Sequence, residues 1–321
     1  SVSGKRFDTV VQIGIGGSVL GAQMCCHALK DCSDIQLRYL FLSTIDPVHV
    51  QAFFDSLDLE TTLFIVVSKS GRTAETAFQF DALRSYLEVK GFGPEYLKLH
   101  GVVVTVPGSL LDLPDDVRGV FYLDEAIGGR FSTTSSVGIL VLGLVYGVGF
   151  IDEFLGGARH ADELSMVRDI QQNIPLMMAL IGVWERSFLG IEGKVVVPYA
   201  EGLSCLVGYM VQMFCESHGK SKSISGEVLG YKTGGLYLGG IGTDLQHSLF
   251  QLLHQGVGRY SVQFVGVGTD CSGLDSGVFS DGYQKGLDLN MVAQMVGLAL
   301  GDEGIDFSGN RTSDFIYIKQ M

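Results

Sequence analysis

Two segments in the second half of the chain carry side chains that could move protons. Glu216 lies in the run Phe-Cys-Glu-Ser-His-Gly-Lys, and about thirty residues later His247 lies in the run Gly-Thr-Asp-Leu-Gln-His. A carboxylate and an imidazole on separate helical segments supply a general base and a second proton-transfer group. The two segments therefore predict proton transfer on a bound substrate.

The surroundings of Glu216 favour a role as a base and leave one alternative open. Gln212, Glu216 and Lys220 are spaced by four, so a continuous helix would place them on one otherwise apolar face. A carboxylate half-buried on that face would have its proton affinity raised toward neutrality, as a general base requires. In the alternative, Glu216 and Lys220 form an ion pair on an exposed helix.

His247 is also open to two interpretations. On a helix from Leu245 to Gln255, His247 forms one stripe with Gln251 and His254. A histidine among leucine and phenylalanine side chains is usually a hydrogen-bonded core residue. The residues alone therefore support a catalytic role for either histidine no better than a structural one.

A hydroxyl-rich junction in the first half of the chain predicts an anion site. The run from Ser68 to Thr76 follows an apolar strand and opens a helix. It contains four hydroxyls, one glycine and two cations: Ser68, Ser70, Thr73, Thr76, Gly71, Lys69 and Arg72. Free amides and the helix dipole make such a junction suitable for a phosphate. The hydroxyls could instead cap the helix, but capping needs one hydroxyl and not four, so phosphate binding is favoured.

Two glycine-containing turns could also face a ligand. The run from Gly14 to Gly21 follows the first strand, but Val19 replaces the third glycine of a dinucleotide fingerprint, so dinucleotide binding is disfavoured. A tight structural turn and a ligand-facing turn stay equally supported there. In the run from Gly128 to Ser132, Arg130 lies beside two glycines and suits an oxyanion. Taken alone, a surface salt bridge explains Arg130 better.

The elements that must position these residues follow an α/β pattern. Apolar strands are predicted at Thr9 to Ile15, Leu37 to Ser43, Leu63 to Ser68, Gly101 to Val106 and Val120 to Leu123. Helical patterns between them, such as Gly17 to Lys30 and Thr73 to Lys90, predict a parallel sheet covered on both faces. Residues 1–153 are therefore expected to form a first doubly wound α/β domain.

A second α/β series follows and defines residues 154–321 as a second domain. After the helical stretch from Asp152 to Leu189, the predicted elements are strand Lys194 to Pro198, helix Gly202 to Ser217, helix Leu245 to Gln255, strand Val262 to Val267, helix Tyr283 to Leu300 and strand Asp314 to Ile318. The series stops directly after a strand, although a strand of a parallel sheet is normally followed by a helix that covers the sheet. The second domain is therefore expected to be truncated at its C-terminus.

Composition limits the possible partners. The 321 residues, 46% of them hydrophobic, suffice for two cores, and the formal net charge of −13 argues against nucleic acid or an anionic membrane as the main partner. The uncharged run 135–151 is expected to be a buried helix and not a membrane span.

The first residues lack a signal-peptide pattern and the cysteines show no CxxC or metal-like spacing, so a cytoplasmic setting is expected. The cysteines are Cys25, Cys26, Cys32, Cys205, Cys215 and Cys271.

Taken together, these segments resemble the phosphoglucose isomerase family. The resemblance covers nearly the whole chain, in the family's order, through Gly14 to Gly21, Ser68 to Thr76, Gly129 to Gly138, Phe154 to Asp162, Glu216 to Lys220, Gly242 to Gly256 and Phe307 to Ser313. It implies two sugar-isomerase domains with the active site between them and at a homodimer interface. It also implies interconversion of glucose 6-phosphate and fructose 6-phosphate without a metal or an organic cofactor.

The resemblance also implies a set of site residues. The phosphate would be held by Ser68, Lys69, Ser70, Thr73 and Thr76. The sugar pocket would include Gly17, Ser18 and Gln212. Glu216 would move the proton between C2 and C1 through a cis-enediol, while Arg130 would stabilise the negative charge that builds on the oxygens. His247 resembles the histidine that helps to open the sugar ring and that the partner subunit contributes.

The chain departs from the family pattern in three places. Arg72 stands where the family usually has a small hydroxyl residue, and Thr312 stands where it commonly has proline. The family's C-terminal Gly-Val-Glu-Leu-Gly-Lys stretch and its N-terminal helical region are absent from residues 1–321, so a fragment of a longer protein is expected. Two alternative functions stay open: another sugar-phosphate isomerase of this domain type, and a non-catalytic sugar-phosphate sensor.

Overall fold

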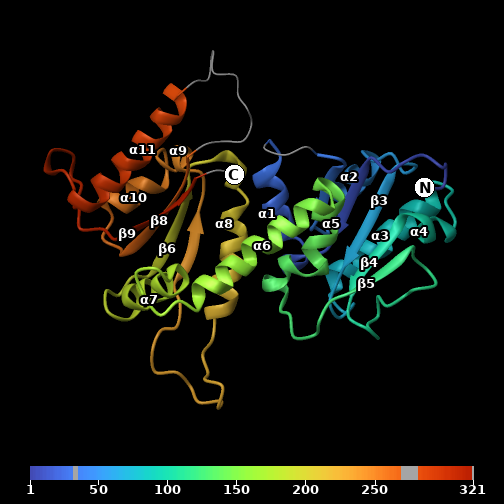
Figure 1. Ribbon diagram of the computed structural model, residues 1–321, viewed down its shortest axis with the longest axis horizontal. Helices are drawn as coiled ribbons and strands as arrows, with labels where there is room; N and C mark the ends of the chain where they lie inside the picture. The colour runs from blue at the N-terminus through green and yellow to red at the C-terminus, as the bar shows by residue number, and fades with distance from the viewer. Residues whose placement is uncertain (32–34, 269–280, 320–321) are drawn as a thin grey trace. The chain divides into compact units, whose positions relative to one another are not determined.

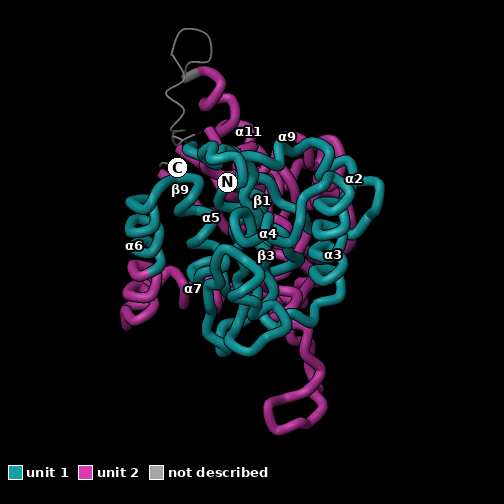
Figure 2. Tube along the Cα trace, turned by 90° about the vertical axis from the view of Figure 1, so that its right-hand side faces the viewer, with its two compact units in different colours: residues 1–26, 34–158 teal, residues 27–33, 159–321 magenta. Residues whose placement is uncertain are grey.

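The predicted apolar runs become the strands of two parallel sheets. The computed structural model describes residues 1–31, 35–268 and 281–319. Contacts between Cα atoms divide the chain into unit 1, residues 1–26 and 34–158, and unit 2, residues 27–33 and 159–321 (Figure 2). Each unit contains one sheet (Figure 1), so the predicted fold class of two α/β domains built on parallel sheets is confirmed.

The sheet of unit 1 has five parallel strands in the order β2-β1-β3-β4-β5. Their bounds are β1 (Thr9–Ile13), β2 (Arg38–Leu42), β3 (Thr62–Val67), β4 (Gly101–Thr105) and β5 (Gly119–Tyr122). These are the five strands that the sequence predicts for this half. Every residue of β1, β3 and β4 is buried, which explains why these strands are apolar throughout and do not alternate.

Helices cover both faces of this sheet. Their bounds are α1 (Leu20–Leu29), α2 (Pro47–Asp55), α3 (Ala74–Val89), α4 (Glu95–His100) and α5 (Ser136–Tyr146). Val11 and Ile13 of β1 join a core with residues of α2, α3 and α4 on one face. Gln12 points to the opposite face, where its amide donates to the carbonyl of Val137 in α5. The sheet is therefore doubly wound, as Figure 1 shows.

The sheet of unit 2 has four parallel strands in the order β7-β6-β8-β9. Their bounds are β6 (Gly193–Pro198), β7 (Leu236–Gly239), β8 (Tyr260–Val267) and β9 (Ser313–Ile318). The sequence analysis predicts β6, β8 and β9 but misses β7. This strand is four residues long and has glycines at both ends, so it offers too short an apolar run to stand out.

Helices lie on both faces of the second sheet as well. Their bounds are α7 (Ile174–Ser187), α8 (Leu206–Val211), α9 (Gly242–Leu245), α10 (Leu249–Gln255) and α11 (Asp281–Leu300). Phe250 of α10 and Met291 of α11 pack on one face of the sheet. Leu206 of α8 packs with Val265 of β8 on the other. Two elements predicted as single helices are interrupted, as described below.

The uncharged run 135–151 is two helices and not one. α5 ends at Tyr146 because Gly147 has a φ of +90°, and α6 (Val148–Ser165) begins at the next residue. Among residues 1–31, 35–268 and 281–319, none of the helices combines the length and the hydropathy that a membrane span needs. The two compact units divide within α6, the helix that also holds the predicted domain boundary after residue 153.

Candidate active site

The hydroxyl-rich run forms a tight loop between β3 and α3. The hydroxyl of Ser68 accepts a hydrogen bond from the amide of Gly71 at 3.2 Å and lies 3.4 Å from the hydroxyl of Thr73. Thr73 is the N-cap residue of α3, but its side chain makes no capping hydrogen bond. The helix cap considered as an alternative is therefore not formed at Thr73, and the loop keeps the features of an anion site.

Gly71 gives this loop its shape. Its φ of +65° lies in the left-handed region, and a Cβ there would lie 2.8 Å from the amide nitrogen of Leu111. The hydroxyl of Ser70 accepts from the amide of Arg72 at 3.1 Å, and both of these residues are exposed. Thr76, in contrast, is buried in the first turn of α3. The phosphate-binding roles of these residues stay predictions.

The first glycine-containing turn lies beside the end of β3. A Cβ at Gly14 would lie 2.8 Å from the Cβ of Ser18 and 3.0 Å from the carbonyl oxygen of Val67. Gly17 and Ser18 belong to a short 3-10 helix, η1 (Gly16–Ser18), that precedes α1. The amide of Gln12 donates to the carbonyl of Ser18 at 2.7 Å and anchors this turn to the sheet.

The arginine-containing turn packs directly on the first turn. Arg130 is the second residue of the 3-10 helix η2 (Gly129–Thr134). A Cβ at Gly17 would overlap the main chain of Gly129 and lie 2.7 Å from the amide nitrogen of Arg130. The buried hydroxyl of Ser132 donates its one hydrogen between the carbonyls of Gly129, at 2.6 Å, and Gly17, at 3.1 Å. This contact joins segments more than a hundred residues apart, and the sequence analysis did not foresee Ser132.

Arg130 itself is half-buried. Its guanidinium carbon lies 4.9 Å from the centroid of the Phe131 ring, a cation–π distance that limits where the side chain can move. Because β1 and β3 are neighbouring parallel strands, the turns that follow them meet at the carboxyl edge of the first sheet. The structure therefore brings Gly17, Ser18 and Arg130 together at the edge where the Ser68 loop starts.

Lys69 reaches this arginine-containing segment from the Ser68 loop. Its ammonium donates to the carbonyl of Ile127 at 3.1 Å and to the carbonyl of Glu125. The sequence analysis assigns Lys69 to the phosphate and does not foresee these main-chain partners. The ammonium is therefore placed between the loop and the residues that lead to Arg130.

In unit 2, Glu216 lies in a π-helix and not in a continuous α-helix. α8 ends at Val211, and Gln212–Glu216 form the π-helix η4. A π-helix has i→i+5 hydrogen bonds, so the spacing of four from Gln212 to Lys220 no longer defines one face. Such turns are frequent at functional sites, and no local residue pattern predicts them.

The predicted half-burial of the Glu216 carboxylate is wrong for this chain. Glu216 is exposed, and its helix ends two residues later at His218. Residues 219–235 then extend away from the sheet (Figure 1) and contain an isolated β-bridge between Lys222 and Val228. The ammonium of Lys220 donates to the main-chain carbonyl of Glu216 at 2.6 Å. Gln212 is half-buried, and its Oε1 atom is covered without a hydrogen-bond partner in the described part of the chain.

His247 lies in a turn and not on a helix face. α9 ends at Leu245 and α10 begins at Leu249, so the stripe predicted for His247, Gln251 and His254 is wrong. Ser248, with φ −149° and ψ −88°, breaks the helix. His247 is exposed in this turn.

His254 has the structural role that was the alternative for both histidines. It is buried, its Nε2 lies 2.8 Å from Oε1 of Gln294, and its ring stacks on Phe307 with centroids 4.0 Å apart. Phe307 begins the last segment of the family resemblance. In this chain it completes the packing around His254.

A half-buried asparagine, Asn290, holds the segment before His247. The side-chain oxygen of Asn290 accepts a hydrogen bond from the hydroxyl of Tyr199 at 3.1 Å and another from the amide of Gln246. A Cβ at Gly242 would overlap the Tyr199 ring, so α9 packs closely on it. Burial raises the pKa of Tyr199 to about 12, so the phenol remains a donor at neutral pH.

Replacing Asn290 with leucine is expected to lower the free energy of unfolding by about 1–3 kcal/mol, because two donors lose their acceptor. Urea denaturation of the complete natural polypeptide measures the change. Leu289→Ala, at a neighbouring position that is 58% exposed, is the control and should change stability by about 0.5 kcal/mol or less. Equal stability of the Asn290 variant and the parent would show that Asn290 does not hold this segment.

Glu216 and His247 lie at opposite edges of the second sheet. His218, two residues after Glu216, packs against Gly234 just before β7 begins, which is the amino edge. Gly242 packs on Tyr199 just after β6 ends, and that is the carboxyl edge. A six-residue strand separates these edges by roughly 20 Å. Within unit 2, one copy of the chain therefore does not bring both groups to one substrate carbon.

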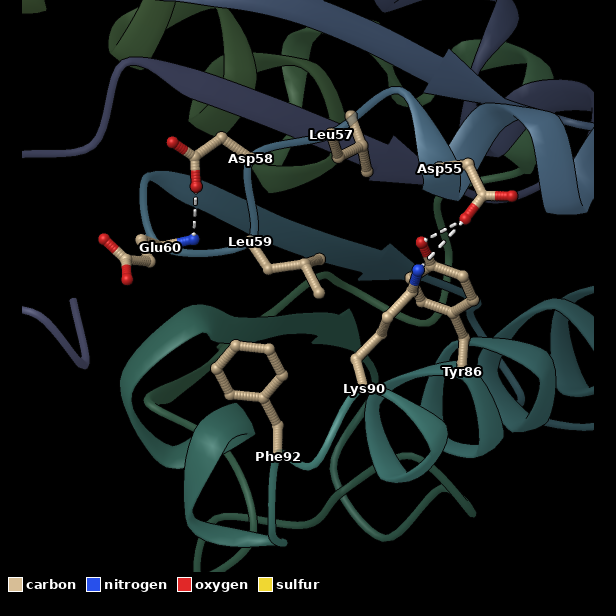
Figure 3. Close-up of a pocket in the computed structure, with 8 residues that line it drawn as sticks. All are labelled: Asp55, Leu57, Asp58, Leu59, Glu60, Tyr86, Lys90 and Phe92. Carbon is tan, nitrogen blue, oxygen red and sulfur yellow. Dashed lines mark hydrogen bonds and ion pairs between the residues drawn. The ribbon is translucent and has the colours of Figure 1, made fainter.

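A hollow on unit 1 lies away from the candidate site. It has a volume of about 370 Å³ and is lined by Asp55, Leu57, Asp58, Leu59, Glu60, Tyr86, Lys90 and Phe92 (Figure 3). These residues come from the end of α2, the segment between α2 and β3, the end of α3 and the segment that follows α3, at the amino edge of the sheet. Asp55 accepts from the Tyr86 hydroxyl at 2.7 Å and from the Lys90 ammonium at 3.3 Å. Its three carboxylates make this hollow unsuitable for a phosphate.

The described cysteines are free thiols. Burial raises the pKa of the Cys25 thiol to about 11 and raises that of Cys26 as well, so both behave as inert core residues. Cys32 and Cys271 lie outside the described residues. In residues 1–31, 35–268 and 281–319, no group of three His, Cys, Asp or Glu side chains could hold a metal ion.

Two doubly wound parallel sheets, with a serine- and threonine-rich loop at the carboxyl edge of the first, define the sugar-isomerase class of α/β proteins. Residues 1–313 match the model of one family in this class, described as phosphoglucose isomerase, and the chain belongs to that family.

Known relatives agree with this membership. The chain is 39% identical over 322 residues to a glucose-6-phosphate isomerase of Treponema denticola, covering 99% of this chain and 61% of the relative. It is similar to the crystal structure of a glucose-6-phosphate isomerase from Chlamydia trachomatis, with a TM-score of 0.91 and 38% identity over 98% of this chain and 61% of that one. A hypothetical protein from Thermus thermophilus matches with a TM-score of 0.79 and 26% identity, over 98% of this chain and 73% of that one. The chain thus spans about three-fifths of the length of its curated relatives.

Proposed function

We propose that the protein carrying this chain interconverts glucose 6-phosphate and fructose 6-phosphate. The observation that carries the proposal is the packing of Gly17 against Gly129 and Arg130, at the edge of the sheet where the Ser68 loop begins. This arrangement combines a loop suited to a phosphate with a cation suited to a nearby oxyanion, as a sugar phosphate requires. Membership of the phosphoglucose isomerase family supports the same reaction.

In this proposal the phosphate loop anchors the substrate. The exposed hydroxyl of Ser70, the half-buried hydroxyl of Thr73 and the first amides of α3 would bind phosphate oxygens. Ser68 is buried, and its hydroxyl accepts a hydrogen bond from the Gly71 amide. Ser68 would hold the loop in shape through this bond and would also bind the phosphate. Thr76 and Lys69 complete the proposed phosphate-binding set.

Proton transfer would then run through Glu216. Its carboxylate would take the proton from C1 of fructose 6-phosphate, and the electron pair left on C1 would form the double bond of a cis-enediol. The C2 carbonyl oxygen gains a proton as this enediol forms. Returning the carbon-bound proton to C2, while the hydroxyl on C1 loses its proton and becomes the aldehyde oxygen, gives glucose 6-phosphate. Arg130 would stabilise the negative charge on the oxygens, with Gln212, Gly17 and Ser18 lining the sugar pocket. This reaction requires no metal or organic cofactor, because the carbonyl next to the migrating proton already acidifies it.

We also propose that the protein acts as a homodimer. Glu216 and His247 of one chain lie at opposite edges of the second sheet, so a second copy is a simple source of the histidine. His247 of the partner subunit would then help to open the sugar ring. A cytoplasmic location is part of the proposal, and the free thiols at Cys25 and Cys26 are compatible with it.

A coupled assay tests the proposed reaction. The complete natural polypeptide is expected to form glucose 6-phosphate from fructose 6-phosphate, measured through NADPH produced by added glucose-6-phosphate dehydrogenase. Unphosphorylated fructose is the control and should react far more slowly, because it lacks the group that the loop anchors. No product from fructose 6-phosphate would contradict the proposed function.

A further inference from the structure

Lys69 links the phosphate loop to the main chain that leads to Arg130. Its ammonium donates to the carbonyls of Glu125 and Ile127, which lie across the carboxyl edge of the sheet from the loop. An ammonium has three donors, and these two carbonyls use two of them. One donor is left for an anion held in the loop.

The carbonyls that Lys69 binds lie directly before the turn that bears Arg130. Gly128 separates Ile127 from η2. The far side of η2 is held by the close packing of Gly17 on Gly129 and by the Ser132 hydroxyl. Only Gly128 and Gly129 lie between Ile127 and Arg130. A shift of residues 125–127 would therefore also displace Arg130. Gly17 constrains this turn on one side, and Lys69 constrains the chain that enters it.

We propose that Lys69 is a positioning residue that couples a phosphate in the loop to the placement of Arg130. With phosphate present, one ammonium bridges the anion and the two carbonyls, so binding the far end of the substrate draws the arginine-containing segment into place. This inference rests on the proposed function for its kinetic part. The simpler alternative is that Lys69 contributes positive charge to the phosphate and nothing to Arg130.

A double-mutant cycle with Arg130 separates these two roles. In the complete polypeptide, Lys69→Met is expected to lower kcat about tenfold. This is the effect of losing one hydrogen bond to a charged group, taken at the lower end of the usual energies of such bonds. In the Arg130→Gln background, the same Lys69 substitution should change kcat by less than about threefold, because its route of action is already removed. Lys69→Arg should restore most of kcat, since a guanidinium can also donate to both carbonyls.

Lys90→Met is the matched control for loss of a surface charge. Lys90 directly follows α3 and pairs with Asp55 at the amino edge of the sheet, opposite to the edge that bears Lys69. Its substitution should leave kcat unchanged. Thermal unfolding of each variant checks that the fold is retained. Equal effects of Lys69→Met in the parent and in the Arg130→Gln background would overturn the coupling.

A second readout needs no enzymatic activity. Hydrogen exchange of peptides across residues 125–131 is expected to become faster in Lys69→Met than in the parent, and inorganic phosphate should slow it in the parent much more than in the variant. Unchanged exchange in both conditions would overturn the proposal even in an active enzyme. Faster exchange in a protein without isomerase activity would support the positioning role and contradict the proposed function alone.

Discussion

Replacing Glu216 with glutamine is expected to lower kcat for fructose 6-phosphate by about 10²–10⁴-fold, the usual contribution of a general base. Glutamine keeps the size of the side chain but cannot accept the proton from C1. The substitution leaves the loop proposed to anchor the phosphate unchanged, so substrate affinity should change by less than about threefold. A large loss of kcat with retained binding is therefore the signature expected of a base.

Two measurements complete this experiment. The coupled assay gives kcat. Isothermal titration calorimetry with a phosphorylated sugar acid, which cannot isomerise, gives the dissociation constant. Glu227→Gln is the matched control, because Glu227 is another exposed acid of unit 2 and its loss changes the net charge equally. If Glu216→Gln keeps kcat within about threefold of the parent, Glu216 is not the base. A parent protein that binds sugar phosphates without turning them over would instead be a sensor.

Replacing Gly17 with alanine is expected to lower kcat/KM by about 10²-fold, because a displacement of about 1 Å at a catalytic group can cost that much. The added Cβ would overlap the main chain of Gly129 and lie 2.7 Å from the Arg130 amide nitrogen. Main-chain atoms cannot rotate away as a flexible side chain can, so η2 must shift and carry Arg130 with it. Overpacking of this kind should also lower the free energy of unfolding by about 1–3 kcal/mol.

Steady-state kinetics and urea denaturation measure the two effects of Gly17→Ala. Gly156→Ala is the control, since a Cβ at this position in α6 meets no atom within 4 Å. The control is expected to keep kcat/KM and to gain a few tenths to about 1 kcal/mol of stability from the better helix former. Full activity in Gly17→Ala would show that the contact between η1 and η2 does not place Arg130.

Local patterns were sufficient for most of the sheets and for the position of the Ser68 loop between a strand and a helix. The strands of unit 1 are continuous apolar runs because helices bury both of their faces, and that pattern is readable without coordinates. The Ser68 loop was recognisable because hydroxyls and a glycine cluster at a strand-to-helix junction. α2 was missed although Asp46 and Pro47 carried its signal, an N-cap acid whose side chain accepts from two amides and a proline at the first position.

The errors share a different origin. The π-helix at Gln212–Glu216 and the break at Ser248 occur inside segments whose composition is that of ordinary helices. Phe214 of the π-helix stacks on Tyr237 of β7 with centroids 4.3 Å apart, and this distant partner does not appear in any local window. Helix periodicity therefore predicted faces for Glu216 and His247 that tertiary packing overrides.

The sequence by itself determined the fold class, the family, and which residue types are available for phosphate binding and proton transfer. The tertiary structure alone decided that Gly17 packs on Gly129, that Lys69 binds the main chain before Arg130, and that Glu216 and His247 lie at opposite edges of one sheet. The reason is physical. Strand and loop signals depend on neighbours a few residues away, whereas these contacts join residues tens to more than a hundred positions apart and arise when parallel strands align their ends.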